Sequence, residues 1–226
     1  MTATTSIPAV PAAGSDCTAA FRAAYENRYT WDPGFQGYRG RCIWSQAGRC
    51  MEGKFQVGAD LKATVEGIDD GEVHKAVASQ LWEVAIHRVR RSFEQTHGSN
   101  TFTAGDTDTV GTEVIVGGKN AGDRYRIKDN VVTMVHRHVH GTVVTIYTDS
   151  VTHTGAGYLS HTYSSRYDDP VSGEPRGGLN LFTDRFAPLG DGGPWVLVSR
   201  VIHTEAEDGG EGDIQEFRFE ELEPLG

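Results

Sequence analysis

The sequence predicts an α+β fold: a large, curved, half-barrel-like antiparallel sheet with a long helix packed on one face and a short N-terminal helix. Three observations lead to this prediction. After Gly98, short β-branched and aromatic runs alternate with turn signals almost to the end of the chain. The clearest helical periodicity comes before them, at residues 69–93. We find no strand–helix–strand alternation and no glycine-rich phosphate loop, so a parallel sheet is not expected.

The chain has the size of one large domain. Its 226 residues are enough to bury a proper core. Residues 1–15 are rich in Ala, Thr and Pro and are expected to form a disordered tail. We therefore expect residues 16–226 to form a single α+β domain, and the sequence leaves the oligomeric state open.

Composition narrows the classes of partner. A formal net charge of -10 argues against a nucleic-acid groove or binding to an anionic membrane surface. No apolar run approaches the ~20 residues of a membrane span. The N-terminus lacks the basic start and apolar stretch of a signal peptide, so we expect a cytoplasmic protein. Three cysteines are an odd number and are expected to be reduced thiols.

The N-terminal part reads as one helix followed by strands. A helix is expected to open at Ser15 or Asp16 and run to about Arg28. Residues 38–65 are strand-like, with a probable turn at Ala47-Gly48. A two-residue turn there would pair residues 45 and 50 across two strands.

The longest helix is expected over residues 69–93. Asp69 and Glu72 have the spacing of a capping box at its start. Two apolar stripes predict burial over more than half of its circumference. One stripe runs from Val73 to Val84, and the second predicts that Trp82, Ile86 and Val89 pack in the core against the sheet.

The main clue to chemistry is a strand-like run in which His136, His138 and His140 alternate with other residues. Alternate residues of a strand share a face, roughly 6.6 to 6.8 Å apart. Two neighbouring imidazoles can therefore bind one ion, either His136 with His138 or His138 with His140. His136 and His140 would be roughly 13 Å apart, too far to share it. The alternative is a polar sheet face exposed to water.

A carboxylate joins these histidines if the hairpin register is regular. Asp129-Asn130 favours a two-residue turn, and counting back from it places Asp123 opposite His136. Two imidazoles and one carboxylate are typical ligands of iron and are accepted by zinc, whereas the general affinity order favours copper. The alternative is a simple Asp–His hydrogen bond, and a one-residue register error would remove the site.

His161 is a further candidate ligand. If His140-Gly141 is a hairpin turn, His161 lies opposite Ser150, well along from His138. If the chain runs straight through Gly141, His161 can approach His140. A strand of about 18 residues would exceed the usual three to ten, which favours the hairpin. No Gly-x-Ser-x-Gly motif indicates a serine nucleophile.

Four segments together resemble a family of uncharacterised proteins best known from cyanobacteria and plants and catalogued only as a domain of unknown function. The segments are FRAAYENRYTWDP (21–33), QLWEVAIHRVRRSFEQTHG (80–98), VHRHVHGTVVTI (135–146) and GYLSHTYSSRY (157–167). The resemblance covers nearly all of the chain after residue 16 and implies one domain, but it implies no activity or catalytic residue.

The expected layout is also similar to the lipoprotein-carrier half-barrels of the LolA-like fold. That similarity implies an apolar cavity between sheet and helix, suited to an acyl chain or another hydrophobic small molecule.

Three functions follow as hypotheses. The leading one is a metal-dependent, oxidative enzyme acting on a small molecule, with copper, iron or zinc on His136, His138 and Asp123 or on a neighbouring His140 or His161. The alternative is a non-catalytic carrier or binder of a hydrophobic or mixed-polarity small molecule in a half-barrel cavity. A structural or assembly factor is a third. The enzyme is favoured if His136 and His138 face the long helix, and the binder if they face water.

Overall fold

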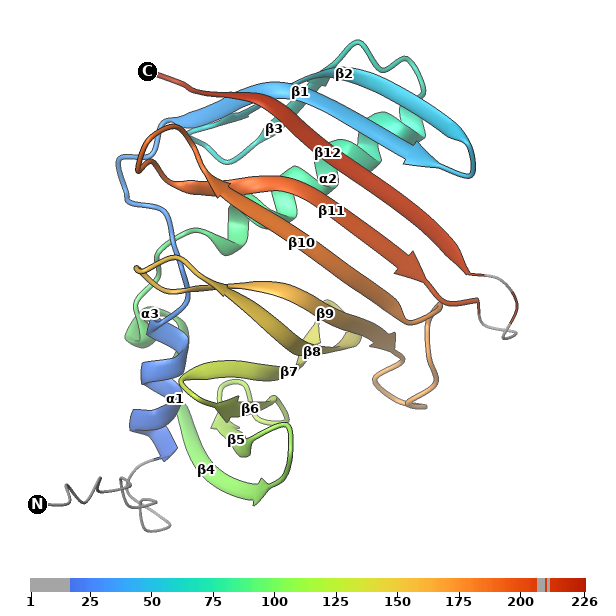
Figure 1. Cartoon of the computed structure of the whole chain (residues 1–226). Coiled ribbons are helices and arrows are strands. Elements are labelled where there is room, and N and C mark those ends of the chain that lie inside the picture. Colours follow the sequence, from blue (N-terminus) through green and yellow to red (C-terminus); the bar gives the residue numbers. More distant parts are fainter. Residues whose placement is uncertain (1–16, 207–209, 211) are drawn as a thin grey trace, which may run out of the picture.

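A computed structural model describes residues 17–206, 210 and 212–226, so the predicted N-terminal tail lies outside the described residues (Figure 1). The described chain forms one twelve-stranded sheet in the order β3-β2-β1-β12-β11-β10-β9-β8-β7-β6-β5-β4. The strands are β1 Gly37–Gln46, β2 Arg49–Gly58, β3 Ala63–Glu66, β4 Asn100–Thr107, β5 Thr112–Gly118, β6 Arg124–Lys128, β7 Val131–Val139, β8 Thr142–His153, β9 Tyr158–Asp168, β10 Asn180–Pro188, β11 Trp195–Thr204 and β12 Asp213–Pro224.

The topology joins two meanders. Strands β1 to β3 form one and β4 to β12 form the other, and the antiparallel pairing of β12 with β1 unites them. The chain leaves the first meander at β3, one edge of the sheet, and enters the second at β4, the opposite edge. The connection between these edges carries the helices α2 (Gly71–His87) and α3 (Phe93–His97), while α1 (Cys17–Glu26) precedes β1.

The predicted α+β class, with its long helix, is wrong. Strands hold 54% of the structure and helices only 16%, so the protein is mostly β. The prediction of an antiparallel sheet is confirmed at every strand pair. None of the described helices is both long enough and apolar enough to cross a lipid bilayer.

The expected helix over residues 69–93 is divided in two. Asp70, rather than Asp69, caps α2 by accepting hydrogen bonds from two backbone N–H groups of its first turn. The helix ends when Val89 forms a short parallel bridge with Trp31. Ser92 and Gln95 then form a capping box that opens α3. The Ser-x-x-Gln motif is present in the sequence, but it lies within an apolar periodicity that predicts one continuous helix.

Helix α2 buries one of its two apolar stripes. It packs chiefly on β1 to β3 and contributes Val73, Val77, Leu81, Val84 and Ala85 to the main core. The prediction that the second stripe is core is wrong for Trp82, which is 51% exposed, and Ile86 is only half-buried. One helix face meets the sheet here, because the sheet covers α2 from one side only.

All three helices lie on the same face of the sheet. Arg200 of β11 donates a hydrogen bond to Gln80 of α2 (2.6 Å), and Val135 of β7 packs in the cluster around α1 and α3. Directly opposed residues of neighbouring strands share a face, and so do alternate residues of one strand. Followed strand by strand across the sheet, the register places Arg200, Tyr163, Ile146 and Val135 on the same face. We call this the helix face and the opposite one the outer face.

The tight turns agree with the sequence. Asp129 and Asn130 have φ of 51° and 60°, and the residues that flank them, Lys128 and Val131, are paired. His140-Gly141 and Ala47-Gly48 also turn with positive φ, so the hairpin between β7 and β8 is confirmed. Cys17, Cys42 and Cys50 are free.

A pair of neighbouring substitutions tests the burial of α2. Leu81→Ala, at a fully buried position, should lower the free energy of unfolding by about 2 to 5 kcal/mol. Trp82→Ala, at the next position, should lower it by less than about 1 kcal/mol because its ring is half exposed. Chemical denaturation measures both, and a larger loss for Trp82→Ala would contradict the packing of α2.

The α1 cluster predicts a pH dependence of stability. Burial, and then the charges of Arg137 and Arg28, lower the pKa of His97 from 6.5 to about 4. The unfolded chain therefore takes up this proton first as the pH falls. The contribution of neutral His97 to the free energy of unfolding is complete above about pH 6.5. Up to about 3 kcal/mol of that free energy is lost as the pH falls from about 6.5 to 4.

The matched variant is His97→Gln, which cannot take up a proton in this range. Its unfolding free energy, measured by chemical denaturation across the same pH series, should fall less steeply than that of the wild type. Parallel curves for the two proteins would contradict the prediction.

Candidate functional site

The histidine strand has a register that differs by one residue from the predicted one. A bulge between Arg126 and Ile127 places Arg124, not Asp123, opposite His136. The turn and its first pair are as expected, so the predicted pairing is wrong only beyond the bulge. No local turn signal marks that bulge in the sequence.

Asp123 nevertheless lies beside one of the histidines. Its carboxylate is 3% exposed and accepts a hydrogen bond from the backbone N–H of His138 (3.0 Å). The Nδ1 atom of His138 lies 3.5 Å from Asp123 Oδ1, and Arg137 Nε lies 3.4 Å from Oδ2. The carboxylate is thus held by the loop before β6 and by β7.

The remaining candidate ligands are dispersed. The rings of His136 and His138 are neighbours, with centroids 5.8 Å apart, but His136 Nδ1 bonds with the Thr145 hydroxyl (2.9 Å). His140 is exposed in the turn, and His161 Nδ1 bonds with the backbone oxygen of Asp184 (2.6 Å). Within the described ranges, no three His, Cys, Asp or Glu side chains are grouped to hold a metal ion.

His161 cannot reach His138. The residue that lies level with His138 on β9 is Asp168, through Val143 of β8. His161 is seven residues further along β9, roughly 23 Å away on a straight strand. The predicted separation of His161 from His138 is therefore confirmed, although Thr162 rather than His161 lies opposite Ser150.

The imidazoles of His136 and His138 lie on the outer face. Val135, adjacent to His136, packs on the helix face, so alternation sends His136 and His138 to the other side. Burial first, and then the charge of Arg124, lower the pKa of His136. The sequence could predict that these two side chains share a face, but not which face the helices would cover.

The helix face carries a second candidate site, which we call the inter-helix surface. Helix α2 packs mainly on β1 to β3, and α1 mainly on β4, β6 and β7, which leaves β8 to β10 between them. Tyr167 of β9 is 45% exposed here. Half-buried apolar and aromatic side chains continue this surface along the strands: Val144, Ile146, Tyr163 and Phe182.

Helix α2 faces this surface directly. Burial, and then the negative charge of Glu83 on α2, raise the pKa of Tyr167. Tyr163 stacks in parallel on Phe182, with centroids 4.6 Å apart. These flat aromatic rings favour contact with apolar groups of a ligand.

A buried ion pair contacts the residues of this surface. Arg200 and Asp184 are each 2% exposed and are joined by two hydrogen bonds of 2.8 and 2.6 Å. Arg200 also donates to the Tyr163 hydroxyl (2.8 Å) and to Gln80 of α2. The pair therefore ties the sheet, the aromatic stack and the helix together. Sequence analysis missed it, because the two partners belong to no local motif.

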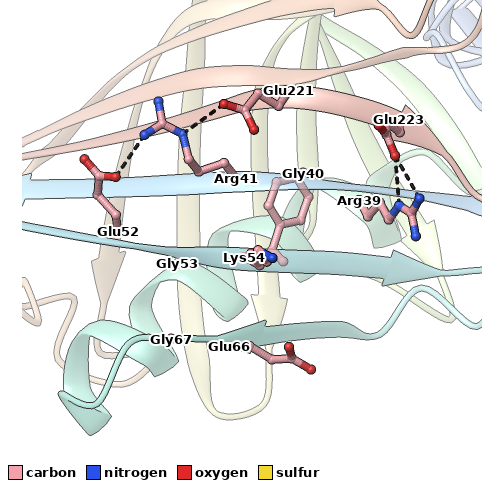
Figure 2. A pocket seen from close by; sticks show the side chains of 11 residues that line it. Arg39, Gly40, Arg41, Glu52, Gly53, Lys54, Glu66, Gly67, Glu221 and Glu223 are labelled. Carbon is pink, nitrogen blue, oxygen red and sulfur yellow. Dashed lines mark hydrogen bonds and ion pairs between the residues drawn. The ribbon is translucent and has the colours of Figure 1, made fainter.

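A third candidate is a hollow of about 710 Å³ where β1 to β3 meet β12 (Figure 2). Arg41 lies among the carboxylates of Glu52, Glu220 and Glu221, and Arg39 pairs with Glu223 at 2.8 Å. The two arginines that line this hollow, Arg39 and Arg41, already have carboxylate partners inside or beside it. Ion pairs at such a solvated surface are worth little to stability.

Comparison with known proteins gives one sequence family. The family described as "Protein of unknown function (DUF3386)" matches residues 12–225. No curated protein matches the sequence.

Solved structures resemble the chain only in layout. A LolA superfamily protein from Nitrosomonas europaea is 8% identical with a TM-score of 0.34, and the alignment covers 93% of this chain and 94% of that one. A DUF1329 family protein from Desulfovibrio piger is 6% identical with a TM-score of 0.27, covering 93% and 94%. The MucA/MucB complex of Pseudomonas aeruginosa gives 9% identity and a TM-score of 0.25, covering 94% and 100%. No residue role is transferred from these structures.

The buried ion pair gives a testable contrast in stability. Asp184→Ala leaves the Arg200 charge buried without its partner and should cost about 3 to 5 kcal/mol of unfolding free energy. Glu223→Ala removes an exposed partner of Arg39 and should cost at most about 1 kcal/mol. Equal losses in urea denaturation would show that the Arg200–Asp184 pair does not hold the inter-helix surface together.

Proposed function

We propose that this chain, which belongs to the DUF3386 family of proteins of unknown function, is a non-catalytic carrier or binder of a hydrophobic or mixed-polarity small molecule. The ligand binds on the inter-helix surface, between α1 and α2. The observation that carries this proposal is the exposure of Tyr167, beside the half-buried rings of Tyr163 and Phe182, on the face that otherwise packs against helices.

The physical argument concerns apolar area. Aromatic side chains that are half exposed on a face covered elsewhere by helices retain apolar surface that a ligand can remove from water. The rings of Tyr163 and Phe182 extend this surface, and the Arg200–Asp184 pair holds it in place. A preformed surface loses little conformational entropy when a ligand binds.

The position of the histidines favours the binder over the metal-dependent oxidative enzyme. His136 and His138 lie on the outer face, away from the inter-helix surface, so an ion there would not meet a ligand bound between the helices. Asp123 contacts His138 and Arg137, an arrangement that a structural hydrogen bond explains.

A neutral fluorescent hydrophobic probe such as Nile red tests the proposal. The wild type should bind it with saturation, and the double variant Ile146→Ala/Tyr167→Ala should bind it at least about fivefold more weakly, because two apolar side chains of the inter-helix surface are lost. The matched control is Tyr147→Ala, which removes a 42% exposed ring from the outer face and should leave binding unchanged. Absence of saturable binding, or an equal loss in Tyr147→Ala, would overturn the proposal.

The rival function has its own measurement. Protein purified without an affinity tag is incubated with copper, iron or zinc, and bound metal is quantified. A stoichiometric ion that is lost in the double variant His136→Ala/His138→Ala would favour the metal-dependent enzyme. Unchanged probe binding in that variant would support a ligand site on the helix face.

A further inference from the structure

We propose that the ligand of the inter-helix surface is an amphiphile with an anionic head group, such as a fatty carboxylate, and that Arg28, Arg88 and Arg137, with His87, bind this head group. The inference rests on the proposed function, because it names the chemical class of the ligand at that same site.

The cations converge from three parts of the chain. Arg28 follows α1 and is bridged to Tyr158 at the start of β9. Arg88 ends α2 and donates a hydrogen bond to the backbone oxygen of Tyr29, the residue after Arg28 (3.0 Å). Arg137 lies on β7, and its position between His136 and His138 directs it to the helix face. The charges of all three arginines act on His87, so their guanidinium groups gather around the end of α2.

Two of these arginines lack a carboxylate partner. Among the described residues, Arg28 and Arg88 form no ion pair, and their contacts are with backbone oxygens and with the rings of Tyr25 and Phe186. The Nε atom of Arg88 is buried without a hydrogen-bond partner. Desolvated guanidinium groups without a counter-charge are costly, and a bound anion would compensate them.

The nearby carboxylates already have partners. Asp184 is bound by Arg200, and Glu83 lies 3.4 Å from the same guanidinium. Asp123 takes the backbone N–H of His138 and one side of Arg137. Arg137 keeps 41% of its side chain exposed and so retains donors for a ligand.

His87 lies among these arginines. It is the last residue of α2, and its pKa is lowered to about 4. Loss of solvation among the packed elements is the first cause, and the charges of Arg88, Arg28, Arg200 and Arg137 add to it. A neutral imidazole in a cationic field is suited to donate a hydrogen bond to an oxyanion. This local charge contrasts with the net charge of -10 for the whole chain.

The apolar part of the ligand then has a defined direction. Val144 of β8 and Tyr167 of β9 lie level with Arg137 in the register, and Ile146 is the next residue of β8 on the same face. A head group at these arginines therefore places an alkyl chain against Ile146 and Tyr167. Both ends of an anionic amphiphile find complementary groups on one surface.

Three ten-carbon ligands that differ in charge provide the test: decanoate, 1-decanol and decyltrimethylammonium. They are titrated into the full chain near neutral pH, with displacement of Nile red as the readout. Decanoate should bind roughly tenfold more tightly than decanol, and decyltrimethylammonium more weakly than decanol. The advantage of decanoate should shrink at high salt, whereas decanol affinity should not.

Variants assign the effect to residues. Arg28→Gln and Arg137→Gln should each remove most of the advantage of decanoate over decanol, and Arg28→Lys should restore part of it. Arg124→Gln is the matched control, since Arg124 is an exposed arginine of the adjacent strand β6 on the outer face. Circular dichroism and unaltered decanol affinity establish that each variant is folded.

The outcomes separate the two proposals. If decanol and decanoate bind equally to the wild type, or if Arg124→Gln matches Arg28→Gln, the anionic head group is wrong while the binder stands. If none of the three ligands nor Nile red binds, the proposed function itself fails.

Discussion

The connection from β3 to β4 is the constraint on which the remaining structure depends. These two strands are opposite edges of a twelve-stranded sheet, and the chain must pass from one to the other over a single face. Helices α2 and α3 make that passage, and α1 packs on the same side. Both helical cores therefore lie on one face, and the strands between them carry the proposed ligand surface (Figure 1). The other face carries the side chains of His136, His138 and Tyr147.

Local features of the fold were predictable, whereas the class was not. Asp129-Asn130 and His140-Gly141 adopt left-handed turns because their residue types tolerate positive φ, and at Ala47-Gly48 it is the glycine that does so. The helix over residues 69–93 was overextended because apolar periodicity continues through Val89, which the tertiary contact with Trp31 takes out of the helix. A periodic pattern cannot report such a contact. The balance between sheet and helix follows from many pairings of this kind.

The candidate site, too, could be predicted from the sequence only in part. Alternation in β7 correctly predicts that His136 and His138 share a face, and it also sends Arg137 to the opposite one. The bulge at Arg126 and Ile127 shifts Asp123 by one position, and no residue type there requires it. The cations of the proposed head-group site lie at positions 28, 88 and 137. They are brought together only by the passage of the chain over the sheet, so no local spacing could reveal them.

The pairing of β12 with β1 has a consequence for biosynthesis. Residues 37–46 hydrogen-bond with residues 213–224, across almost the whole chain, so β1 lacks one neighbour until the last strand has left the ribosome. Pairing between such distant segments is slow, because a long loop must close before any hydrogen bond is gained. During that interval β1 is an open edge with an apolar side, formed by Tyr38, Cys42 and Trp44, that any other extended chain can join. The nascent chain is therefore most prone to misassociation at the strands that are synthesised first. A chaperone that shields residues 37–46 would act at the step where misassociation competes most with folding.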